Sequence, residues 1–325
     1  MSDNRLAGLD ALRGIAAVCV VLFHLWPQQM VNGYLAVDLF FLLSGYVMAR
    51  AFEPAFAAGL TPGQFVRARY IRLWPTMTIG GLLCLPFFLD QYGAALLPVA
   101  AANLLMLPLP ILGLAFPLNG PGWSIFFELV ANALHGAVLW RMTAARIAIL
   151  VAAMAAVLAL VAALSQQSIE VGMRPDAFWA GVPRVLMSYG GGILLWRLWR
   201  DSPPLAVPPL AGLAVLPLYI LANGLQGGSR WPIDLLFVLV GGPLAMAGAL
   251  RFTAVPRWLV WLGAISFPLY AVHFAAISAA RALGFGNIIG IAAALAAASA
   301  VAAIEPGLRR AITAKRPKAI ALSPK

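Results

Sequence analysis

The stretch DALRGIAAVCVVLFHLWP, residues 10–27, is an apolar run long enough to cross a membrane, yet it contains an arginine and a histidine. Arg13 and His24 are eleven residues apart, which is almost three whole helical turns, so both side chains lie on one stripe of a helix. Their separation along the axis is about 16 Å, roughly half the hydrocarbon thickness of a bilayer. Such residues inside a span are costly, so the pair predicts a functional site. The simpler interpretation is that Arg13 extends to the interface and His24 caps the far end.

The composition of the whole chain indicates a polytopic helical membrane protein. Of its 325 residues, 62% are hydrophobic and only 10% are charged, whereas soluble domains have about 25% charged residues. The first run lacks a small-residue cleavage site, so we expect it to be retained as a span. The formal net charge is +11, but the basic residues lie in loops and at the ends of the runs. The positive-inside rule explains that charge, and we expect no nucleic-acid partner.

Apolar runs separated by Pro, Gly or Arg clusters recur along the chain. They cover residues 10–27, 34–51, 73–90, 94–116, 122–140, 147–164, 179–196, 205–222, 232–250, 258–281 and 286–304. The fourth run contains Asn103 and several prolines, which favours a re-entrant or broken segment over a straight span. If that run does not cross, most basic residues fall on one side of the membrane. The sequence therefore predicts an all-α transmembrane bundle of about ten spans with both termini in the cytoplasm.

No polar linker or shift in composition divides the chain, so we expect one membrane domain over residues 1–306. Glu305-Pro306 is expected to close the last span, and residues 307–325 to form a basic, disordered cytoplasmic tail. Cys19 and Cys84 both fall within apolar runs, which favours buried thiols over a disulfide.

Three titratable residues are predicted to share one level near the outer surface. The first span runs outward and brings His24 there, and Asp38 and Glu128 follow close to the outer ends of later spans. Asp38 is then a natural partner for the His24 imidazole, and the three groups together predict a catalytic, proton-handling site. The alternative for Asp38 is a plain carboxylate at a helix start.

A second group of residues predicts an anion site at the cytoplasmic face. Arg69 and Arg72 are spaced i, i+3 on one helical face just before a span, and Arg13 ends near the same face. Two guanidinium groups at this spacing suit a phosphate. The alternative is a positive-inside cluster that binds lipid head groups.

Further polar residues occur at several depths in the predicted spans and in one outer loop. Ser266, Tyr270 and His273 fall on one stripe of an outward-running helix, which predicts either a hydrophilic cavity or a hydrogen-bonded core network. His135 is interpreted as a packing histidine, and the Ser44-Gly45 pair as a step that allows close helix approach. Four polar residues of an outer loop and the start of the next span are candidates for contact with a polar acceptor: Glu170, Arg174, Asp176 and Arg184. The alternative is an ordinary solvated loop, which has the same composition.

Taken together, these residues resemble the acyltransferase family 3 of integral-membrane O-acyltransferases, over nearly the whole chain. The matching positions, in order, are Arg13, His24, Gly33, Asp38, Phe40, Phe41, Ser44, Gly45, Arg69, Arg72, Trp74-Pro75, Trp123, Ser124, Glu128, Ser266, Tyr270, His273 and Glu305-Pro306. Ile125 stands where the family usually has leucine. The extracellular SGNH domain of some members is absent from the sequence, so we expect the stand-alone type.

The resemblance implies an acyl-coenzyme A donor, acetyl-coenzyme A by default, with no permanently bound cofactor and no metal. Arg13, Arg69 and Arg72 would bind the donor at the cytoplasmic face. His24 would remove the proton from an acceptor hydroxyl at the outer face, with Asp38 or Glu128 orienting it. The remaining matched polar residues would contact the acceptor or the developing oxyanion: Trp123, Ser124, Ser266, Tyr270 and His273. An acyl-histidine relay is the alternative mechanism.

The implied partners are membrane lipid, acyl-coenzyme A and a carbohydrate or glycolipid, such as exopolysaccharide or lipopolysaccharide, at the bacterial inner membrane, with envelope assembly proteins nearby. Two other functions compete with this one. A proton-coupled exporter of sugars could use His24, Asp38 and Glu128 as a relay, although no inverted repeat is visible. A non-catalytic envelope scaffold would have no reason to bear the insertion cost of those residues.

Overall fold

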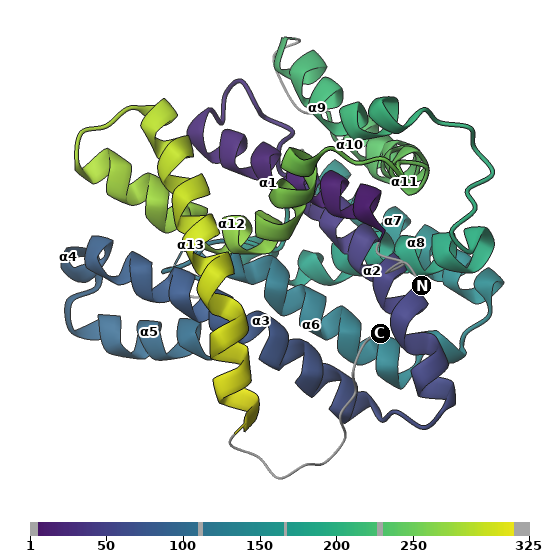
Figure 1. The fold of residues 1–325 in the computed structure, drawn as a ribbon, viewed down its shortest axis with the longest axis horizontal. Helices are drawn as coiled ribbons and strands as arrows, with labels where there is room; N and C mark the ends of the chain where they lie inside the picture. The colour runs from purple at the N-terminus through teal and green to yellow at the C-terminus, as the bar shows by residue number, and fades with distance from the viewer. Residues whose placement is uncertain (1–5, 110–112, 166–167, 226–229, 315–325) are drawn as a thin grey trace.

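The computed structural model describes residues 6–109, 113–165, 168–225 and 230–314, and these residues form helices and connecting segments without strands (Figure 1). The helices are α1 (Ala7–Leu25), α2 (Leu35–Ala57), α3 (Pro62–Cys84), α4 (Leu89–Tyr92), α5 (Leu96–Leu104), α6 (Gly122–Ala137), α7 (Ala144–Ser165), α8 (Gly181–Trp199), α9 (Pro209–Leu225), α10 (Trp231–Leu236), α11 (Gly242–Leu250), α12 (Arg257–Ala282) and α13 (Asn287–Ala314). The all-α prediction is confirmed, and a helix covers at least part of every predicted apolar run.

Six helical segments in the described part of the chain are long and apolar enough to cross a membrane. They are α1, α2, α7, the continuous run Trp231–Leu250, α12 and Asn287–Ile312 of α13. A bent pair, Pro62–Phe87 with Leu89–Leu104, makes a seventh candidate. The chain is therefore a multi-pass membrane protein. The count of about ten spans and the cytoplasmic termini stay predictions.

The fourth apolar run, 94–116, is broken as predicted. After α3 the chain bends by 77° and continues through α4 into α5, which packs back against α3 at one edge of the molecule (Figure 1). α5 has nine residues, which corresponds to about 13 Å, so it is too short to cross a bilayer alone. Residues 110–112 of this run lie outside the described residues.

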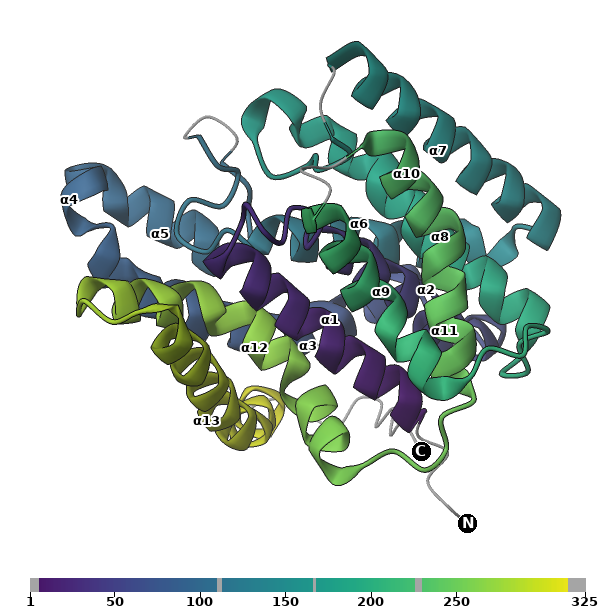
Figure 2. The same cartoon turned by 90° about the horizontal axis from the view of Figure 1, so that it is seen from above.

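The helix α1 lies at the centre of the bundle. Figure 2 shows it crossing the middle of the molecule with α12 and α9 on its two sides. Glycines allow this packing: a Cβ added at Gly14 would come within 2.9 Å of the backbone of Gly263 on α12. The predicted close approach at Gly45 is confirmed, since a Cβ there would lie 2.0 Å from the Tyr189 carbonyl of α8.

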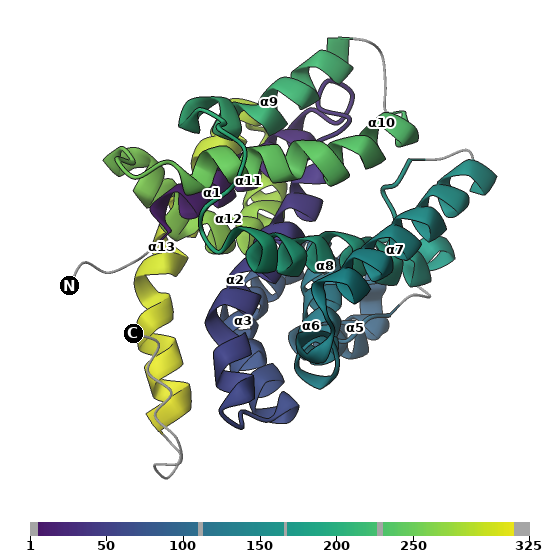
Figure 3. The ribbon, with the colours of Figure 1, turned by 90° about the vertical axis from the view of Figure 1, so that its right-hand side faces the viewer.

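The last helix departs from its predicted end. α13 does not stop at Glu305-Pro306 but continues to Ala314, so the first part of the tail expected over 307–325 is helical. The Thr76 hydroxyl of α3 donates to the Glu305 carboxylate at 2.9 Å, and Arg309, one turn later, pairs with the same carboxylate. These contacts hold the helix beyond the proline. Figure 3 shows α13 at one edge of the molecule, opposite α7. Residues 315–325 lie outside the described residues.

Candidate active site

A cavity of about 640 Å³ lies between α1, α2, α3, α6, α12 and α13, and we call it the arginine cavity. Its charged lining residues are Asp10, Arg13, Arg50, Arg69, Arg72, Glu128, Glu305 and Arg309. The five arginines outnumber the three carboxylates, so the cavity attracts anions. Its volume is within the usual range for small-molecule and cofactor sites, about 300–1,000 Å³.

The start of α3 places two of these arginines. The Thr61 hydroxyl accepts from the backbone N–H of Gln64, and the Gln64 side chain accepts from the backbone N–H of Thr61. With Pro62 in the first turn, these contacts form a complete helix-start signal. Because the helix begins there, Arg69 and Arg72 lie two to three turns inside α3, on one face, and both line the arginine cavity.

Arg69 and Arg72 differ in their partners. Arg69 is buried, and its Nη2 donates to Glu128 Oε1 at 2.9 Å. The Ser44 hydroxyl donates to the same oxygen at 2.7 Å. Arg72 is exposed to the cavity and, within the described residues, forms no hydrogen bond or ion pair. Arg13 is paired with Asp10 at 2.9 Å. Arg72 is therefore a cation available to an anionic ligand.

The contact with Arg69 corrects the expected position of Glu128. Glu128 was expected to share the outer level of His24 and Asp38, but it lines the arginine cavity instead. The reason is that α3 begins eleven residues before the predicted span at 73–90. Arg69 consequently lies inside the bundle beside α6, where a buried guanidinium requires a carboxylate partner.

Asp38 also lacks the partner expected for it. Both of its carboxylate oxygens bind the buried Arg184 of α8, with Nη2–Oδ2 at 2.7 Å, and the Ser188 hydroxyl donates to Oδ1 at 3.1 Å. The expected contact with His24 is not formed. α8 packs against α2 and presents a guanidinium to this carboxylate, and in the low-dielectric interior a full cation is a stronger partner than a neutral imidazole.

A second cavity, of about 40 Å³, lies near the other end of α1, and we call it the histidine cavity. Its polar and aromatic lining residues are Phe23, His24, Tyr34, Trp123, Glu170, Arg184 and Tyr270. His24 Nδ1 lies 2.9 Å from the Val20 carbonyl oxygen. Because a carbonyl only accepts, Nδ1 carries the proton, and Nε2 of the neutral ring keeps its lone pair. Nε2 is therefore the atom that can act as a base.

His273 lies beside His24, with ring centroids 4.9 Å apart. Its Nδ1 faces the carbonyls of Leu269 at 3.1 Å and Tyr270 at 2.9 Å, so its proton is also on Nδ1. Its Nε2 is buried and has no hydrogen-bond partner among the described residues. The two neighbouring imidazoles therefore both keep an Nε2 lone pair at one end of α1.

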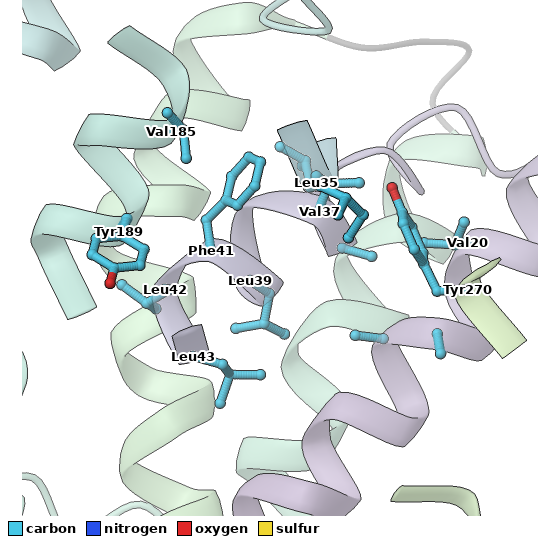
Figure 4. Close-up of a cluster of buried hydrophobic side chains, with 14 of the residues drawn as sticks. Val20, Leu35, Val37, Leu39, Phe41, Leu42, Leu43, Val185, Tyr189 and Tyr270 are labelled. Carbon is cyan, nitrogen blue, oxygen red and sulfur yellow. The ribbon is translucent and has the colours of Figure 1, made fainter. Parts of the chain in front are cut away.

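Tyr270 separates the two cavities, because it and Val37 line both. Figure 4 shows Tyr270 beside Val20 and Val37. The Tyr270 hydroxyl lies 2.6 Å from the Ser124 hydroxyl, and Ser124 lines the arginine cavity. The cavities therefore share a wall that contains a pair of hydroxyl groups.

The remaining predicted site residues divide between the two cavities. Trp123 lines the histidine cavity, and Ser266 lines the arginine cavity while its hydroxyl donates to Gly263 O at 2.7 Å.

Cys19 and Cys84 are buried free thiols, as predicted. In the part of the chain that the structure describes, no group of three or more His, Cys, Asp or Glu side chains could hold a metal ion.

The structure separates the polar residues of the outer loop. Glu170 and Arg184 line the histidine cavity, whereas Arg174 and Asp176 pair with each other at 3.5 Å on the surface, with side chains 70% and 64% exposed. Arg50 and Arg309 also line the arginine cavity, although neither was predicted as a site residue from the sequence. The spacing of Glu305 and Arg309 at i, i+4 was the available signal for Arg309.

Comparison with known proteins decides the family. The family model described as "Acyltransferase domain" matches residues 6–304, which include all of the histidine cavity and all of the arginine cavity except Glu305 and Arg309. This chain belongs to the acyltransferase 3 family. It is thus a transferase that acts on acyl groups, as the resemblance predicted.

Individual relatives are more distant. Protein 2 in picA locus of Rhizobium radiobacter is 36% identical over 183 residues, which cover 49% of this chain and 95% of that protein. O-acetyltransferase OatA of Staphylococcus aureus is 43% identical over 47 residues, which cover 14% of this chain but only 8% of OatA. No solved structure matches this acyltransferase.

Proposed function

We propose that this acyltransferase moves an acyl group, expected to be acetyl, from cytoplasmic acyl-coenzyme A to a hydroxyl of a carbohydrate or glycolipid outside a bacterial inner membrane. The observation that carries the proposal is the wall shared by the two cavities, which brings an anion-attracting site next to the His24 imidazole. The name of the short OatA match, an O-acetyltransferase, supports acetyl transfer to oxygen.

The arginine cavity is suited to the donor. The phosphates of coenzyme A would bind Arg72 first, because it has no competing carboxylate, with Arg69 and Arg13 adding charge. Arg13 and His24 lie on the same helix, about 16 Å apart along its axis. The extended pantetheine arm would cover this distance and bring the thioester to the wall at Tyr270.

Transfer would take place at that wall. His24 Nε2 takes the proton of the acceptor hydroxyl while the hydroxyl oxygen attacks the thioester carbonyl carbon. The carbon–sulfur bond then breaks, the acyl group stays on the acceptor oxygen, and the leaving thiolate takes the proton from the imidazolium. The Ser124 and Tyr270 hydroxyls, which lie 2.6 Å apart, would donate to the oxyanion that forms on the carbonyl oxygen. In the alternative relay, His24 Nε2 itself attacks the thioester and passes the acyl group on.

The supporting residues take roles that fit their contacts. Glu128 holds Arg69 in the arginine cavity, and Asp38 holds Arg184 in the wall of the histidine cavity. Trp123 would position the acceptor, and His273 would take up or share the proton next to His24. A proton-coupled transporter gains no support from this geometry, because Asp38, Glu128 and His24 do not form a relay.

The test uses the full-length protein in nanodiscs with radiolabelled acetyl-coenzyme A and compares it with the His24→Ala variant. We expect His24→Ala to lower turnover by about 100-fold or more, the usual contribution of a general base, while coenzyme A binding stays unchanged. Unchanged turnover in His24→Ala would reject the base. Absence of donor binding to the unmodified protein would reject the whole proposal.

A further inference from the structure

We infer that Glu170 is an acceptor-binding residue, which accepts hydrogen bonds from sugar hydroxyls next to the reacting one. The inference rests on the proposed function and extends it to the acceptor side. Glu170 lies between α7 and α8 and lines the histidine cavity together with His24 and Tyr270. A hydroxyl bound by Glu170 would therefore lie in the same small space as the proposed base.

The carboxylate of Glu170 is not used by the fold. Within the described residues its side chain has no hydrogen-bond or ion-pair partner, unlike Asp38, Glu53 and Glu128, which each bind an arginine. Burial raises the pKa of the Glu170 carboxyl, and nearby Arg184 opposes that shift. A partly buried carboxylate without a partner is costly, and the hydroxyl groups of a bound sugar would compensate for its lost hydration.

The segment that carries Glu170 is held in place by several contacts. Arg184 Nη1 donates to the Val171 carbonyl at 3.0 Å. The next residue, Gly172, has a φ of +100° and packs so closely on Trp123 that an added Cβ would lie 2.8 Å from the ring. The backbone N–H of Ala115 donates to the Met173 carbonyl at 2.9 Å. The carboxylate is therefore presented by a fixed backbone, as a specificity residue requires.

The other walls of the cavity favour a polyol over an anion. Arg184 is neutralised by Asp38, and its guanidinium lies 5.2 Å from the Trp123 ring and 5.3 Å from the Tyr34 ring. Besides this neutralised guanidinium, the cavity is lined by the Glu170 carboxylate, the His24 imidazole and aromatic side chains. An anionic acceptor would be repelled by Glu170. A carbohydrate provides both the hydroxyl donors for Glu170 and an apolar face for the aromatic rings.

The test measures binding of simple sugar probes, methyl glucoside, methyl galactoside and methyl mannoside, to the nanodisc protein by saturation-transfer NMR. Three proteins are compared: unmodified, Glu170→Gln, and Asp176→Asn as a control carboxylate in the same loop. We expect at least one probe to bind, Glu170→Gln to weaken that binding about tenfold or more, and Asp176→Asn to leave it unchanged. A tenfold loss corresponds to about one charge-assisted hydrogen bond.

A second measurement separates this inference from the proposed function. Acetyl-coenzyme A binding and its acceptor-independent hydrolysis are followed in the same samples. We expect both to be unchanged in Glu170→Gln, which would exclude a general loss of structure. Equal probe binding by the unmodified protein and Glu170→Gln, or no probe binding at all, would overturn the role of Glu170. Failure of acetyl-coenzyme A binding in the unmodified protein would instead overturn the proposed function.

Discussion

At the scale of single residues, the role of a charged side chain in the two cavities depends on whether it has an oppositely charged partner. Arg69 and Arg184 are buried and bound to carboxylates, so they contribute to the stability of the fold as well as to the site. Among the described residues that line the cavities, Arg72, Glu170 and Nε2 of His24 have no such partner and are available to ligands. The sequence shows which residues are titratable, but only the partner distinguishes a structural charge from an available one.

The two arginines of α3 are expected to respond differently to truncation. Arg72→Ala should raise the KM for acetyl-coenzyme A about 10- to 100-fold, since a hydrogen bond to a charged group contributes about 1.5–3 kcal/mol. Its thermal stability should be unchanged. Arg69→Ala should raise the KM and also lower the unfolding temperature, because it leaves the partly buried Glu128 without its cation. Steady-state kinetics and thermal unfolding in detergent measure both effects, and equal unfolding temperatures for the two variants would contradict this assignment.

The Asp38–Arg184 pair gives a second prediction at this scale. Asp38→Asn removes the charge that balances a fully buried guanidinium. We expect a loss of about 3–5 kcal/mol in stability, the usual cost of breaking a buried pair on one side. The double variant Asp38→Leu/Arg184→Met should recover most of that loss, as thermal unfolding would show. If the double variant is as unstable as Asp38→Asn, the unpaired charge of Arg184 is not the cause of the lost stability.

At the scale of elements, small residues determine how closely the helices pack. α2 and α8 approach at Gly45 and Gly192, where an added Cβ would lie 2.0 Å from a backbone oxygen of the facing helix. The same two helices carry Asp38 and Arg184. Close packing of α2 against α8 is therefore a condition for the ion pair in the wall of the histidine cavity.

Gly45→Ala is accordingly expected to separate α2 from α8. The added Cβ meets backbone, which cannot move aside alone, so we expect a destabilisation of about 1–3 kcal/mol, typical of overpacking. Gly63→Ala on α3 is the matched control, because nothing lies within 4 Å of its Cβ position. Thermal unfolding of both variants measures the difference, and a Gly45→Ala protein as stable as Gly63→Ala would contradict the packing.

At the scale of the whole molecule, the two cavities lie near opposite ends of α1. This arrangement of the cavities agrees with the proposal that the donor enters from one side of the membrane and the acceptor from the other. The excess of arginine in the arginine cavity agrees with the proposed cytoplasmic position of that end, because the positive-inside rule expects basic residues there.

The predicted sidedness can be measured in sealed vesicles. Inside-out vesicles should consume added acetyl-coenzyme A, whereas right-side-out vesicles should do so only after permeabilisation, because a polyanion does not cross the bilayer. Detergent-opened vesicles of both kinds serve as the control and should be equally active. Activity confined to right-side-out vesicles would reverse the predicted orientation of the termini.

The sequence alone determined the all-α membrane class, the family and the arginines of α3, because apolar runs, helix-start signals and motif spacing are local properties of the chain. It also placed Arg13 and His24 on one helix. Tertiary structure decided that Glu128 binds Arg69, that Asp38 binds Arg184, and that α13 continues past Pro306. The partner of a buried charge depends on which helices pack together, and residues about 60 and 146 positions apart have no local signal that links them.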